Sequence, residues 1–137
     1  MHLLMMENYK LNNNKQLQWK MIEDINWGKL IQEYQDKPYD KMGEYCINNY
    51  TLQEIIVLQN FAVQKRTELQ EILRDKIKGV SDDTFWDLCA HIVGLGESVY
   101  NLCIKYPEIA QILVKDKQEN FEYGFTKATY ELKMTND

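Results

Sequence analysis

The sequence predicts an all-α fold, a small antiparallel bundle of four to five helices. Three observations support this prediction: apolar residues recur at helical spacing after residue 50, two expected helices carry end signals, and 137 residues is the length of one domain. Such a chain buries roughly two-thirds of the surface that its unfolded form exposes, so it needs neither a disulfide nor a metal for stability. We therefore treat 1–137 as a single helical domain, with 1–15 expected to be loop or partly disordered.

The first fifty residues carry the weakest helical signals. Residues 16–24 stay ambiguous, because their apolar residues fit both the two-residue period of a strand and the spacing of a helix. Asn26 is a good N-cap for a short helix that ends before Pro38. We expect 40–49 to be a connector that contains at most one helical turn.

The strongest helix signal begins at Thr51. Thr51 and Glu54 have the spacing of a capping box, in which the hydroxyl and the carboxylate satisfy two backbone N–H groups of the first turn. Apolar residues continue at helical spacing as far as Ile77, and Gly79 has the residue type that commonly follows a last turn. These signals predict a helix from 51 to 78.

The chain beyond residue 80 is expected to be helical almost throughout. A helix begins at the cap residues around Ser81 and runs to Tyr106, with a kink near 91–97 as an open alternative, and Pro107 opens another helix from its first position. The apolar pattern of 109–132 is interrupted by the polar residues 115–120, which form either an exposed turn of one helix or a break.

The helix 81–106 has a wider apolar sector than a core contact needs. Beside the stripe centred on Ile92 stands a second row, seven residues apart: Trp86, Val93 and Tyr100. Together they cover roughly 200° of the helix. Either this helix is central and covered on two sides, or the row is an interface, since large aromatic residues are favoured anchors at binding surfaces.

Aromatic residues also concentrate near the C-terminal end. One helix face carries apolar residues at i, i+4, i+7 and i+11: Phe121, Phe125, Ala128 and Leu132. We expect this face to pack on the helix 51–78. An alternative adds an aromatic surface formed by outward-pointing Tyr123 and Tyr130, suited to a protein or a flat ligand. Gly124 weakens this helix locally, and the sequence offers no reason for it.

Two glycines lie in the middle of the helix 81–106, where each costs about 1 kcal/mol relative to alanine. Gly96 points into the apolar sector, so a crossing helix could approach it, whereas Gly94 points outward and suggests a kink. Together with His91 they define an alternative site, a pocket for a small molecule or nucleotide between helices.

The sequence contains no catalytic or metal-binding pattern. It lacks the HExxH and Glu-x-x-His spacings. Cys89 and Cys103 lie about 21 Å apart along a continuous helix, which is too far for a shared metal or disulfide. Asp82 and Asp83 belong to a first helical turn, where acidic residues stabilise the helix. We therefore predict no catalytic residue, no metal and no cofactor.

Composition and charge limit the classes of partner. The net charge is −5, and no cluster of Lys and Arg is present, so direct nucleic-acid binding is not expected. No run approaches the roughly 20 apolar residues that span a bilayer, and no signal peptide is recognised. The odd number of cysteines, without a CxxC pair, predicts a cytoplasmic protein whose cysteines are small core residues.

The leading hypothesis is a non-enzymatic protein–protein interaction module that binds a partner protein or homodimerises. The small size, the missing catalytic patterns and the wide apolar sector support it. Lysine far outnumbers arginine, as in AT-rich genomes, which permits one specific version: a phage or mobile-element inhibitor of a larger host protein such as a nuclease. The alternative is a small-molecule or nucleotide-binding helical protein, enzymatic in one version, with the pocket described above.

Overall fold

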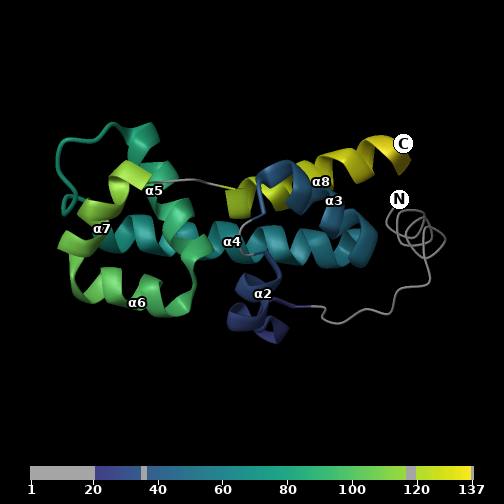
Figure 1. Ribbon diagram of the computed structural model, residues 1–137, viewed down its shortest axis with the longest axis horizontal. Coiled ribbons are helices and arrows are strands. Elements are labelled where there is room, and N and C mark those ends of the chain that lie inside the picture. Colours follow the sequence, from purple (N-terminus) through teal and green to yellow (C-terminus); the bar gives the residue numbers. More distant parts are fainter. Residues whose placement is uncertain (1–20, 35–36, 117–119, 137) are drawn as a thin grey trace.

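Helices account for nearly all of the described chain. The computed structural model describes residues 21–34, 37–116 and 120–136, and within these ranges it contains seven α-helices, two short 3-10 helices and no strand (Figure 1). In chain order they are η1 (Ile22–Asp24), α2 (Trp27–Tyr34), α3 (Tyr39–Asn49), α4 (Leu52–Leu73), α5 (Asp82–Leu95), α6 (Glu97–Lys105), α7 (Pro107–Leu113), η2 (Val114–Asp116) and α8 (Asn120–Asn136). The predicted all-α class is confirmed, with seven helices instead of four to five.

The ambiguous residues 16–24 are described only in part. Residues 16–20, like the expected loop 1–15, lie outside the described ranges. Ile22–Asp24 forms a single 3-10 turn, so the described part of this segment is helical and contains no strand. Asn26 caps α2 as predicted, because its Oδ1 accepts a hydrogen bond of 3.0 Å from the backbone N–H of Lys29.

The longest helix, α4, begins where its capping box predicts. Thr51 Oγ1 accepts from the Glu54 backbone N–H at 3.1 Å, and Glu54 Oε1 accepts from the Thr51 N–H at the same distance. The helix ends at Leu73, earlier than the predicted residue 78. The chain leaves it through a turn in which Asp75 adopts a left-handed conformation, with φ of 67°.

The other helices are arranged around α4, which runs along the long axis of the molecule (Figure 1). Towards one end α8 packs on both α3 and α4, and towards the other α5 and α6 pack on α4 while α7 packs on α6. The core between them is apolar, and three helices, α4, α5 and α8, supply these fully buried members: Ile55, Leu58, Leu69, Leu88, Ile92 and Phe125.

The expected connector 40–49 is instead a complete helix, α3, which follows Pro38 and packs on α8. Two residues of α3, Met42 and Cys46, belong to the apolar core, and they expose only 1% and 0% of their surface. A Cβ atom added to Gly124 would lie 2.6 Å from the Met42 Cβ. The close approach of α3 and α8 therefore explains Gly124, and tertiary packing outweighs the weak helix propensity of α3.

The predicted single helix 81–106 is divided at Gly96 into α5 and α6, within the range 91–97 where a kink was left open. Gly96 has φ of +107°, a backbone conformation that glycine adopts readily and other residues rarely do. The start signals of α5 and α7 are as predicted: Ser81 Oγ accepts from the Thr84 N–H at 3.1 Å, and Pro107 begins α7 after the end of α6. Gly94 does not point outward, since a Cβ there would lie 2.8 Å from the Phe121 Cβ.

Candidate functional site

The break at Gly96 divides the predicted interface row, because Trp86 and Val93 lie on α5 and Tyr100 lies on α6. Val93 is 1% exposed, and its carbonyl accepts a hydrogen bond of 3.2 Å from the Trp27 indole N–H. Tyr100 is 6% exposed, and its hydroxyl donates to the Lys65 carbonyl at 3.0 Å. Val93 and Tyr100 therefore lie in the core. Trp86 is the member of the row that stays half-buried at the surface.

Trp86 is held between groups from two other helices. The guanidinium carbon of Arg66, on α4, lies over the Trp86 ring, 4.0 Å from the ring centre. The Tyr123 ring, on α8, has its centre 5.9 Å from that of Trp86, and the two ring planes are tilted by 33°. Arg66 in turn donates from Nε to Glu122 Oε1 at 2.8 Å and from Nη1 to Gln70 Oε1 at 2.7 Å. These contacts fix the Trp86 and Tyr123 rings before any partner binds.

The α8 helix has large apolar side chains on both of its faces. The inner face packs as predicted, with Phe121, Phe125 and Ala128 buried against α3 and α4. On the outer face Tyr123, Tyr130 and Met134 expose 41%, 65% and 60% of their surface. The spacings of seven and four residues place these three within about 40° of arc on the helix.

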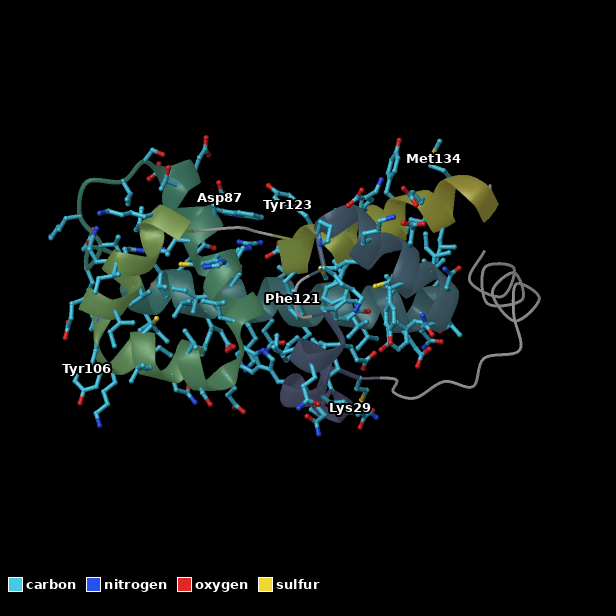
Figure 2. The ribbon with its side chains drawn as sticks, in the orientation of Figure 1. Lys29, Asp87, Tyr106, Phe121, Tyr123 and Met134 are labelled. Atoms are coloured by element: carbon cyan, nitrogen blue, oxygen red, sulfur yellow. The ribbon has the colours of Figure 1, made fainter. Side chains whose placement is uncertain are left out.

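This outer face, with its neighbour Trp86, is the candidate site, and we call it the α8 surface. Its members are Trp86, Tyr123, Lys127, Tyr130 and Met134. Figure 2 shows Tyr123 and Met134 along the same edge of the molecule, both on the outside of α8. Lys127 lies between the two tyrosines in sequence, and its Nζ forms an ion pair of 2.7 Å with Glu131. Met134 was missed in the sequence, although it follows Tyr130 by four residues, a spacing that places two side chains on the same helix face.

Comparison with protein-family models, curated proteins and solved structures returns no match. Its function has to be inferred from its own residues.

Side chains from other helices pack beside both glycines of the alternative ligand site near His91. Phe121 fills the space beside Gly94, and the Ile31 side chain lies 3.6 Å from the position of a Cβ on Gly96. His91 itself is half-buried. Among the described residues no group of three or more His, Cys, Asp or Glu side chains could hold a metal ion. Nor does that part of the chain contain a helix long and apolar enough to cross a membrane.

A polar cluster that the sequence did not predict joins α2 to α3. Glu33 Oε2 accepts hydrogen bonds from the hydroxyls of Tyr45, at 2.9 Å, and Tyr50. Next to it, the Tyr34 hydroxyl lies 3.0 Å from Cys46 Sγ. Burial, together with the Glu33 hydrogen bond and charge, raises the pKa of the Tyr50 phenol. The phenol groups of Tyr45 and Tyr50 therefore stay protonated and donate to Glu33. Their role in the cluster is structural, since they connect α2 to α3.

The three cysteines are buried and form no disulfide. Burial is the main reason that the pKa of Cys89 is raised to about 12. The positive charge of Arg66 lowers this pKa, and the electrostatic interaction with Cys103 raises it. Cys103 can affect the pKa of Cys89 because the two residues lie on different helices, α6 and α5, on either side of the break. The separation of about 21 Å between the two cysteines, predicted for one continuous helix, therefore does not apply. A thiol with such a pKa carries almost no thiolate at neutral pH, which disfavours Cys89 as a nucleophile.

The buried thiol predicts a loss of stability at alkaline pH. Below pH 9 Cys89 is protonated in both states; above its ordinary pKa of 9.0 the unfolded chain releases a proton that the folded chain keeps up to about 12. The free energy of unfolding should therefore fall by about 1.4 kcal/mol per pH unit for this group. Urea denaturation from about pH 8 to about pH 11 measures the slope, which should be shallower in Cys89→Ala. Parallel pH profiles would contradict this assignment.

Proposed function

We propose that this protein is a non-enzymatic protein–protein interaction module that binds its partner through the α8 surface. The observation that carries this proposal is the row of exposed Tyr123, Tyr130 and Met134 on a helix whose opposite face is fully packed. Single exposed apolar residues are ordinary on protein surfaces, but a contiguous patch of them is typical of a binding site. Tyrosine is also among the residues most often found as energetic anchors in interfaces.

The order of the α8 surface supports the same proposal. Trp86 is packed between Arg66 and Tyr123, so those rings lose little conformational freedom when a partner covers them. Tyr130 has only two rotatable side-chain bonds and offers a large contact area at low entropic cost. A second exposed apolar pair, Leu102 on α6 and Tyr106 at its C-cap, spans a single helical turn and offers a smaller surface.

A site-specific photo-crosslinker tests where a partner binds. A benzophenone amino acid at position 134 lies at the end of the α8 surface, and the same group at position 112, on α7, is the control, because Ile112 is 68% exposed. Irradiation in an extract of the source organism should give an adduct of one defined mass from position 134. Adducts of the same mass from both positions, or none from 134, would contradict the proposal.

Truncating the two exposed tyrosines should remove binding without unfolding the protein. Tyr123→Ala with Tyr130→Ala is expected to change the free energy of unfolding by about 1 kcal/mol or less, since both side chains are largely exposed. The same change should weaken partner binding by about 30-fold or more, as for anchor residues. Thermal melts followed by circular dichroism and crosslinking yield from position 134 measure the two effects. Ile112→Ala is the matched control, and an unfolded double variant would place the row in the core instead.

A further inference from the structure

We infer that the partner of the α8 surface is a second copy of this chain, bound with its α8 helix antiparallel, about a two-fold axis between residues 128 and 129. This inference rests on the proposed function, because it names the partner of the same surface. The residues that carry it are the four members of the row on α8: Tyr123, Lys127, Tyr130 and Met134.

The spacing of the row matches itself when one copy is reversed. Its members are separated by four, three and four residues, which is the spacing of a helix–helix seam. Read from either end the gaps are the same. In an antiparallel pair Tyr123 therefore faces Met134 of the second copy, and Lys127 faces Tyr130. A two-fold interface requires this kind of self-complementarity.

The facing side chains are also chemically matched. A methionine sulfur beside an aromatic ring is favourable, and so is a lysine ammonium group over a tyrosine ring. Parallel pairing in register would instead place the two Lys127 ammonium groups together, where like charges repel. Glu131 forms an ion pair of 2.7 Å with Lys127 of its own chain. Because it follows Tyr130 by one residue, it also lies within reach of Lys127 on the second copy. Charge and spacing thus favour the same orientation.

The dimer should be weak, because the row is short. Residues 123 to 134 extend about 17 Å along α8, at roughly 1.5 Å per residue. Even with Trp86 at one end, such a contact is smaller than a standard stable interface. We therefore expect a dissociation constant of roughly 10–100 µM.

Sedimentation equilibrium on the full chain tests the dimer and its charge pairing. Between about 10 µM and about 1 mM the mass should rise from 16.4 kDa towards twice that value. Lys127→Glu and Glu131→Lys should each weaken association by about tenfold, whereas the two changes together should restore it. The same swap in the exposed pair Glu71 and Arg74, 2.8 Å apart on α4 and its C-cap, is the control and should have no effect.

Disulfide trapping tests the orientation. A mixture of Tyr123→Cys and Met134→Cys chains should form a mixed disulfide on oxidation, and Tyr123→Cys by itself should form none, because the two copies of residue 123 lie about 17 Å apart in the antiparallel pair. The native cysteines are buried and should not interfere. Efficient Tyr123→Cys homodimers would overturn the antiparallel arrangement.

The outcomes separate this inference from the proposed function. A chain that stays monomeric up to about 1 mM overturns the inference. If position 134 then crosslinks to a protein of another mass, the interaction module stands and its partner is a different protein. An adduct of twice the chain mass supports both, and the absence of both dimer and adduct overturns both.

Discussion

Replacing Glu122 by leucine is expected to destabilise the protein by roughly 3–5 kcal/mol, the largest effect of any single change considered for this structure. Arg66 and Glu122 form an ion pair of 2.8 Å whose side chains are only 10% and 6% exposed. The Glu122→Leu change leaves the Arg66 guanidinium group buried against the Gln70 amide and the Trp86 ring. An uncompensated buried charge is costly, because it has lost its water and gained no opposite charge.

Replacing both partners should recover much of that loss. Arg66→Met with Glu122→Leu removes the remaining charge and keeps an apolar side chain against Trp86, so the double variant should be more stable than Glu122→Leu alone. The control is the exposed pair Arg74 and Glu71, which has the same N–O distance of 2.8 Å but exposures of 66% and 72%.

Urea denaturation followed by circular dichroism measures all of these variants on one scale. Glu71→Leu is expected to change the free energy of unfolding by about 0.5 kcal/mol or less. The two pairs have the same N–O distance and differ strongly in burial. Equal effects of Glu122→Leu and Glu71→Leu would show that burial of the first pair does not determine its energy.

Gly124→Ala is expected to destabilise the protein by about 1–3 kcal/mol, although alanine is the better helix former. The new Cβ would lie 2.6 Å from the Met42 Cβ and 2.8 Å from its Cε. The Met42 Cβ is fixed to the α3 backbone, so the side chain cannot simply turn away, and α3 and α8 must move apart. The gain in helix propensity is about 1 kcal/mol and is smaller than this cost.

Gly43→Ala, in the same contact between α3 and α8, should have the opposite sign. A Cβ on Gly43 would be 3.6 Å from the Lys127 Cδ and 3.8 Å from the Gly124 carbonyl, which are ordinary contact distances. This variant should be stabilised by about 0.5–1 kcal/mol. Thermal melts of both variants measure the difference. Stabilisation by both substitutions would mean that the two helices are less closely packed than described.

Signals that act within a single helical turn predicted the structure well. The capping box at Thr51, the cap at Ser81 and the first-turn Pro107 all lie at the starts of helices where the sequence placed them. Each of these residues binds or shapes the backbone within three or four positions of itself, so its neighbours in the sequence contain the required information. The all-α class followed from the same kind of periodic, local evidence.

Features that depend on distant contacts or on one backbone conformation were not predicted. The helix α3 has weak propensity and owes its place to α8, more than 70 residues further along the chain. The break at Gly96 depends on a positive φ, which a helical-wheel projection does not contain. That projection was extended across the break, and for this reason Tyr100, on α6, was grouped with Trp86 and Val93, on α5.

In the candidate site, too, the features with local signals were predicted and those that depend on distant contacts were not. Tyr123 and Tyr130 were predicted to point outward in one alternative, because α8 is continuous across both and its period holds. The ion pair that orders the neighbouring Trp86 joins residues 66 and 122, and no local pattern relates them. The chemistry at one end of the α8 surface could therefore not be read from the sequence.

The contact between α3 and α8 also has a consequence for biosynthesis. Of the described helices, α8 leaves the ribosome last, yet it covers residues of α3, such as Met42, that were made early. Until α8 has been synthesised, this part of the core has no cover and stays accessible to chaperones and proteases. The nascent chain therefore cannot complete its fold helix by helix as it emerges, and the last described segment closes the structure in a single late step.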